Sequence, residues 1–225
     1  MTAPSFETTA QFAVPMTLVT HPAPETLNRD LRSLFLARED SGHANPQPLM
    51  RIDAGLFESR FDLFKWPDPC VRELREFCWS SLFRVVAELN GYEPARMARL
   101  RGHADAWFHI TRKGGYFGLH NHAMASWSGV YCVDPGVDHS GRADSGVLSF
   151  PHPNPGAGMY VDLATFSLRR PFTLAPRQFR LQPGQLLLFP SWLLHQVLPY
   201  QGEGERITVA FNAWFREEPA SPRSA

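Results

Sequence analysis

The sequence has few cysteines, and these cannot form a disulfide framework. Three cysteines leave at least one unpaired, and Cys70 and Cys78 both fall on an expected helix. At a rise of about 1.5 Å per residue, they are about 12 Å apart, too far for a disulfide. We therefore expect free thiols, which fits a reducing compartment.

The chain also lacks net charge, with 22 Lys and Arg against 22 Asp and Glu in 225 residues. No overall field attracts nucleic acid or an anionic membrane surface, so we expect neither as a partner. The first residues contain no basic cluster, and no apolar run is long enough to span a membrane. We expect a cytoplasmic protein, and a homodimer is compatible with the sequence.

Apolar residues are plentiful by contrast, at 44% with 17 Phe and 6 Trp. This composition is ample for one packed core in a chain of this length. We predict a single domain over residues 1–225, in which 1–95 support a β-rich core at 96–215. Residues 216–225 are expected to form a frayed tail.

Two helices are expected in the first half of the chain. Residues 24–38 carry leucines at helical spacing, after a short expected strand at 14–19. The second helix begins at Asp68, an N-cap residue followed by Pro69, and ends at Asn90-Gly91, a left-handed stop signal. We expect both helices to pack on the outside of a sheet.

After this helix the pattern changes to short β-rich runs separated by Gly and Pro. The expected strands span residues 106–111, 127–133, 146–150, 185–189 and 207–215. The expected loops span residues 134–145 and 151–159. The intervals are too short for crossover helices, which favours an antiparallel sandwich or barrel such as a jelly roll. The expected class is α+β, mainly β.

A pair of histidines, His120 and His122, follows a glycine-rich turn. In extended backbone, residues two apart point to the same face, so the two imidazoles can converge on one point. Such a pair is also common as ordinary surface polarity, and on its own it does not establish a metal site.

A third histidine follows a strongly apolar strand at residues 185–189 that Pro190 ends. His195 lies just beyond, where it is either a core residue or a metal ligand. Further on, Arg206 and Thr208 share one strand face. Arg206 suits a carboxylate clamp beside a metal, because its planar fork binds both oxygens, and a surface salt bridge is the alternative.

These motifs together resemble the bacterial and phage family of 2-oxoglutarate/Fe(II) oxygenases. The resemblance rests on His120-Asn121-His122, on Ser128-Gly129-Val130-Tyr131, and on Phe189-Pro190-Ser191-Trp192 with His195 and Arg206. It implies a double-stranded β-helix, a cupin-like jelly roll with the N-terminal helices packed outside. It also implies a hydroxylase that consumes O2 and 2-oxoglutarate and releases succinate and CO2.

Carried onto this sequence, the resemblance implies that His120, His122 and His195 bind Fe(II). It implies that Arg206, helped by Thr208, binds the distal carboxylate of 2-oxoglutarate. The wider superfamily has Asp or Glu at the position of His122, which gives two histidines and one carboxylate. This chain therefore departs from that pattern in one ligand.

Trp107, His109 and Tyr131 lie on expected strands near these motifs and are further candidates for contacts with the cosubstrate. Core packing is the alternative for each. The substrate is an amino acid, a peptide side chain or a small metabolite, and the sequence does not choose among them.

Two rival functions fit the same residues. One is a cupin-like metal enzyme that needs no 2-oxoglutarate, since three histidines suit several metals. The other is a non-catalytic β-sandwich binding module whose histidines are structural. Mutation of Arg206 should abolish turnover of 2-oxoglutarate but spare a metal enzyme that needs no cosubstrate. Metal analysis of the purified protein distinguishes the oxygenase from a metal-free binding module.

Overall fold

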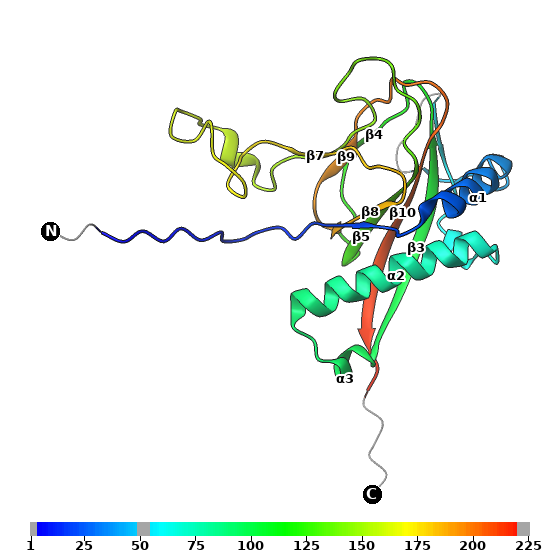
Figure 1. Cartoon of the computed structure of the whole chain (residues 1–225), viewed down its shortest axis with the longest axis horizontal. Coiled ribbons are helices and arrows are strands. Elements are labelled where there is room, and N and C mark those ends of the chain that lie inside the picture. Colours follow the sequence, from blue (N-terminus) through cyan, green and yellow to red (C-terminus); the bar gives the residue numbers. More distant parts are fainter. Residues whose placement is uncertain (1–3, 49–54, 220–225) are drawn as a thin grey trace, which may run out of the picture.

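The computed structural model describes residues 4–48 and 55–219, which form two antiparallel sheets with helices against one of them (Figure 1). The strands are β1 (Thr17–Thr20), β2 (Leu56–Glu58), β3 (Leu100–Thr111), β4 (Phe117–His120), β5 (Trp127–Asp134), β6 (Leu148–Phe150), β7 (Arg177–Phe179), β8 (Gln185–Pro190), β9 (His195–Val197) and β10 (Arg206–Glu217). The helices are α1 (Pro24–Ala37), α2 (Pro69–Asn90) and α3 (Pro94–Met97), with 3-10 turns η1 (Leu63–Lys65) and η2 (Pro155–Gly158).

The larger sheet has the strand order β1-β8-β5-β10-β3-β2, and the smaller has β4-β9-β6-β7. From β3 onward the chain alternates between the two sheets, except that the consecutive strands β6 and β7 pair with each other in the smaller sheet. Side chains of both sheets pack between them, including Phe189 from the larger and Phe150 from the smaller. This arrangement is a double-stranded β-helix, and the predicted fold class is confirmed.

The two predicted helices form with nearly the expected bounds. Pro69 occupies the first turn of α2, where its missing N–H costs no hydrogen bond, although the Asp68 side chain makes no capping bond. Gly91 ends the helix with φ 61°, the left-handed region that glycine adopts without strain. The helices α1 and α2 lie against the outer face of the larger sheet (Figure 1), and their apolar side chains pack into the core there.

The alternation of side chains along β10 separates the core from the space between the sheets. Ile207, Val209 and Phe211 are almost fully buried beneath the helices. Arg206 and Thr208 therefore point to the opposite face, toward the smaller sheet. The larger sheet thus has an apolar face under the helices and a partly polar face toward the smaller sheet.

Several boundaries differ from the sequence-based expectations. The ladder between β3 and β10 continues to the pair of Leu100 with Glu217. The prediction that a frayed tail begins at residue 216 is therefore wrong. Ion pairs of Glu217 with Arg96 and Arg99 hold this end of the ladder. The first strand begins at Thr17 rather than at residue 14.

The patterns did not predict β2, β7 and β9, because three residues are too few to show a period. Cys70, Cys78 and Cys132 are free, as expected. No helix in residues 4–48 and 55–219 is long and apolar enough to cross a bilayer. The predicted single-domain organisation stays a prediction.

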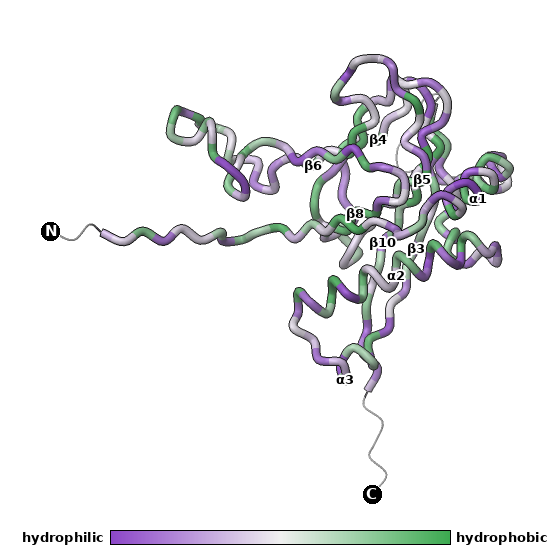
Figure 2. The backbone as a smooth tube through the Cα atoms, viewed as in Figure 1, coloured by the Kyte–Doolittle hydropathy of each residue, from purple (hydrophilic) through white to green (hydrophobic). Residues whose placement is uncertain are grey.

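Two segments project from the sheets on the same side of the molecule (Figure 1). One is the extended N-terminal segment that precedes β1, and the other joins β6 to β7 and contains η2. Both alternate polar and apolar stretches, as the colours of Figure 2 show. Phe12 and Leu163 are almost completely exposed in them, at 102% and 97%.

Candidate metal centre

Strand pairing in the smaller sheet brings the first and third histidines together. His120 ends β4 and lies directly opposite His195, the first residue of β9, in the antiparallel ladder. His122 follows β4, and its backbone N–H donates to the carbonyl of Ser191 at 2.8 Å. The Asn121 amide also donates to the Trp192 carbonyl at 3.2 Å, so two hydrogen bonds fix the turn that carries His122.

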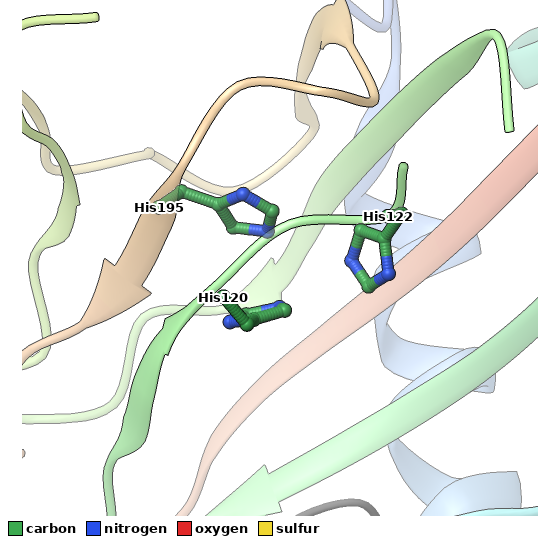
Figure 3. Close-up of side chains that lie close together, drawn as sticks. All are labelled: His120, His122 and His195. Carbon is green, nitrogen blue, oxygen red and sulfur yellow. The ribbon is translucent and has the colours of Figure 1, made fainter. Parts of the chain in front are cut away.

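The three imidazole rings point toward one another (Figure 3). One ring nitrogen from each of His120, His122 and His195 lies within 4.8 Å of the others. The ring centroids of His120 and His195 are 4.2 Å apart, and that of His122 is 4.9 Å from the first and 5.2 Å from the second. The predicted convergence of three imidazoles on one point is present.

Backbone carbonyls orient two of the rings. Nδ1 of His120 lies 2.7 Å from the carbonyl of Gly118, and Nδ1 of His195 lies 2.9 Å from that of Leu193. A carbonyl only accepts, so each Nδ1 must carry the hydrogen and each Nε2 keeps a free lone pair. This is the usual way in which proteins prepare histidines for a metal ion.

Burial keeps these imidazoles neutral. His195 is 4% exposed, and desolvation, followed by the charge of His120, lowers its pKa to about 3. Desolvation and the same charge lower the pKa of His122 to about 4, and desolvation also lowers the pKa of His120. Near pH 7 all three rings are therefore neutral imidazoles with one N–H each, which is the form that binds metal.

The strand register places the predicted carboxylate clamp on the face toward these histidines. Thr208 pairs with His109 on β3, and Ala210 pairs with Trp107. Directly paired residues project to the same face of a sheet. Arg206, Thr208, His109 and Trp107 consequently share the inner face of the larger sheet, which looks toward the smaller sheet.

Arg206 is buried, at 7% exposure, yet it forms no ion pair with any residue in the described part of the chain. Desolvation lowers its pKa from the usual value. Gly146 lies close against it, since a Cβ there would come within 3.2 Å of the arginine Cδ. A buried guanidinium without a carboxylate partner is costly unless an anion completes the site.

Trp107 and His109 lie beside the histidines. The centroid of the Trp107 ring is 5.9 Å from that of His122, and the indole Nε1 lies 3.2 Å from Nε2 of His109. The ring of Phe117 lies between, 5.4 Å from His109 and 4.5 Å from His120. These side chains form one wall of the centre.

Glu58 on β2 is a buried acidic residue that the sequence analysis did not identify. Its Oε2 lies 2.9 Å from Nε2 of His109, and Oε1 accepts from the Asn45 amide at 2.7 Å. Burial would raise the pKa of Glu58, but His109 and then Asn45 outweigh it and the pKa is lowered. Glu58 lies in a three-residue strand without a motif, so no sequence signal marked it.

Tyr131 lies elsewhere. It is fully buried on the helix side of the larger sheet, and its hydroxyl donates to Asn28 Oδ1 of α1 at 2.7 Å. The structure therefore does not bring Tyr131 to the histidines, because it has the opposite strand parity from Cys132, which packs between the sheets.

The donor set fits a first-row transition metal. Three neutral ring nitrogens suit Fe(II), Ni(II) or Zn(II) and leave further coordination positions open to other ligands. Among the residues that the structure describes, no carboxylate belongs to this group.

Comparison of the sequence with known families identifies the same region. A family model described as "Putative 2OG-Fe(II) oxygenase" matches residues 105–212. The match runs from within β3 to within β10, so it includes the strands β4 to β9 and all three histidines. No curated protein sequence matches the chain.

Solved structures share the fold at low sequence identity. A prolyl-4-hydroxylase from Pseudomonas putida has a TM-score of 0.56 at 18% identity, with 91% of this chain and 93% of that chain covered. HygX from Streptomyces hygroscopicus, with nickel, 2-oxoglutarate and hygromycin B bound, has 0.54 at 14%, covering 89% and 82%. A prolyl hydroxylase from Trichoplax adhaerens, in complex with a hypoxia inducible factor peptide, has 0.55 at 12%, covering 88% and 83%.

Proposed function

We propose that this chain is a 2-oxoglutarate/Fe(II) oxygenase, as the family match over residues 105–212 supports, and that it hydroxylates its substrate at the His120, His122 and His195 centre. Its cofactors are Fe(II) and 2-oxoglutarate. The observation that carries the proposal is the convergence of three neutral imidazoles next to a sheet face that presents a buried arginine. Neither feature alone requires 2-oxoglutarate.

In this proposal, His120, His122 and His195 hold Fe(II) through ring nitrogens, with Nδ1–H of the first and third donating to backbone carbonyls. The three donors are uncharged, so the two positive charges of the ferrous ion are balanced by the 2-oxoglutarate dianion. When both are bound, they couple reduction of O2 and decarboxylation of 2-oxoglutarate to insertion of one oxygen atom into a substrate C–H bond.

Arg206 binds the distal carboxylate of 2-oxoglutarate in this proposal. The carboxylate supplies the partner that the buried guanidinium lacks, and the planar fork accepts both oxygens. Thr208, 3% exposed on the same strand face, offers its hydroxyl as a further donor. His109 and Trp107 lie beside them on the same sheet face and limit the access of water to the centre.

The substrate is not set by the fold. The solved relatives include prolyl hydroxylases and an enzyme crystallised with hygromycin B. Unrelated substrates therefore occur on one architecture, and the substrate of this chain depends on the walls around its own centre.

The test is succinate formation by protein purified without a histidine tag. With Fe(II), ascorbate and 2-oxoglutarate in air, we expect slow succinate formation that stops without iron or O2. Arg206→Ala should abolish it, whereas Arg216→Ala, an exposed position on the same strand, should not. Oxygen consumption that persists without 2-oxoglutarate, or in Arg206→Ala, would favour a metal enzyme that needs no cosubstrate.

A further inference from the structure

A cavity of about 870 Å³ lies between the two projecting segments and the sheets. Its walls are residues 10–18 of the N-terminal segment, both ends of the β6–β7 connection at 150–154 and 170–179, and Trp192 with Leu193. Cavities of this size, largely apolar with a few polar groups, typically hold small molecules.

The cavity shares walls with the metal centre. Phe150 lines it, and the centroid of the phenyl ring is 5.6 Å from that of His195. Leu193 lines it as well, and its carbonyl is the acceptor that orients the His195 ring. A molecule that lies against Phe150 and Leu193 is therefore one side chain away from His195, although none of the three imidazoles lines the cavity itself.

The charges in the cavity wall are all of one sign. Arg170 and Arg177 line it, and within the described residues no aspartate or glutamate does. Burial and the charge of Arg170 lower the pKa of Arg177, so these two cations affect each other. Arg177 lies directly opposite Phe150 in the β6–β7 ladder, which brings one cation close to the shared wall.

The remaining wall is apolar and rich in aromatic rings. Phe12, Phe172, Phe179 and Trp192 line it. The Arg177 guanidinium carbon lies 5.4 Å from the centroid of the Phe179 ring, so an aromatic face supports the cation. An occupant that matches this wall has an apolar body and one anionic group.

We propose that this cavity is the substrate pocket and binds a small apolar molecule with one anionic group, a carboxylate, sulfonate or phosphate, held by Arg170 and Arg177. The inference rests on the proposed function for the metal centre. The anionic group is held at the arginines, and the apolar body lies along Phe150 toward His195. Two unbalanced guanidinium groups favour an anion over a neutral or cationic molecule.

The test uses two naphthalene dyes that differ in charge, and metal-free protein. We expect 8-anilino-1-naphthalenesulfonate to bind with increased fluorescence, and Arg177→Gln and Arg170→Gln each to weaken it about ten-fold. Arg169→Gln, an exposed neighbour outside the cavity wall, is the matched control and should bind the sulfonate like the parent. The uncharged N-phenyl-1-naphthylamine should bind all four proteins alike, which shows that the variants keep the cavity.

Equal binding of the sulfonate by the parent and both cavity variants would overturn the proposal. So would failure of both dyes to bind to a protein that elutes as a dimer, since a second copy of the chain would then fill the cavity. Neither result involves iron or 2-oxoglutarate, so each leaves the proposed function standing.

A second readout tests whether the bound anion lies near the histidines. With Mn(II) at the centre, the proton resonances of 1-naphthalenesulfonate should broaden in the parent protein but not in His195→Ala. Arginine-dependent binding without this broadening would overturn the assignment as substrate pocket. Failure of both Mn(II) and Fe(II) to bind the parent would overturn the metal centre and the substrate role with it, while the charge-dependent binding would stand.

Discussion

His120 and His195 lie directly opposite each other in the antiparallel ladder of β4 and β9, with ring centroids 4.2 Å apart. Strand pairing therefore brings these two rings close together. Backbone carbonyls fix both rings in the tautomer that leaves Nε2 free. The centre is preorganised, so metal binding does not have to order it.

Replacement of His195 should remove most of the metal affinity. We expect His195→Ala to lower Fe(II) affinity roughly 100-fold or more, since even loss of an outer-sphere partner commonly costs 10- to 100-fold. Anaerobic equilibrium dialysis measures this directly. His139→Ala, an exposed loop histidine, should bind iron like the parent, and equal affinity in His195→Ala would remove His195 from the centre.

Replacement of Arg206 should weaken 2-oxoglutarate binding without loss of iron. Charge-assisted hydrogen bonds contribute about 1.5–3 kcal/mol, so we expect Arg206→Met to raise the Kd for 2-oxoglutarate about 10- to 100-fold. Arg206→Lys should fall between Met and the parent, because lysine keeps the charge but not the fork. Calorimetry of the iron-loaded proteins measures this, with Arg216→Lys as control. An unchanged Kd in Arg206→Met would contradict the assigned role.

The sequence predicted the residues of the centre because its motifs are local. His120 and His122 are two apart on extended backbone, and period two also placed Trp107 and His109 on one face. It could not predict that His195 opens a strand, since β9 has three residues and is formed by pairing with β4. Such pairing depends on the whole fold and not on local pattern.

Tyr131 should matter for stability and not for cosubstrate binding. Tyr131→Phe leaves the buried Asn28 Oδ1 without its donor, so we expect a loss of about 1–2 kcal/mol in the free energy of unfolding. Urea unfolding measures this loss. The Kd for 2-oxoglutarate should equal that of the parent, and a several-fold rise would return Tyr131 to the cosubstrate site.

Tyr131 also shows where pattern reasoning fails. Residues 130–133 are apolar on both faces of β5, because one face packs under the helices and the other between the sheets. An apolar run of this kind does not reveal which residues point inward. The sequence did not predict Glu58 as a site residue for a different reason, since its partners Asn45 and His109 come from separate segments.

Acid should destabilise the metal-free protein. In the unfolded chain the histidines titrate near 6.5, whereas in the folded protein the pKa of His195 is about 3 and that of His122 about 4. Below pH 6.5 the unfolded chain binds protons that the folded protein does not, so the free energy of unfolding falls with pH. Between pH 7 and pH 5 we expect His195 alone to remove about 2 kcal/mol.

Urea unfolding of the metal-free protein at these two pH values measures the effect. His195→Gln keeps a polar side chain of similar size but does not titrate, so its stability should depend less on pH than that of the parent. His139→Ala should follow the parent. The same pH dependence in the parent and His195→Gln would show that His195 is not a buried neutral imidazole.

The most direct test of the whole account is an anaerobic titration of metal-free protein with Fe(II) and then 2-oxoglutarate, followed by visible absorption. Chelation of the keto acid by ferrous iron should produce a weak metal-to-ligand charge-transfer band in the parent. The band should be absent in His195→Ala and should need more 2-oxoglutarate in Arg206→Met. No band in the parent at saturating iron and 2-oxoglutarate would contradict the assignment of this centre.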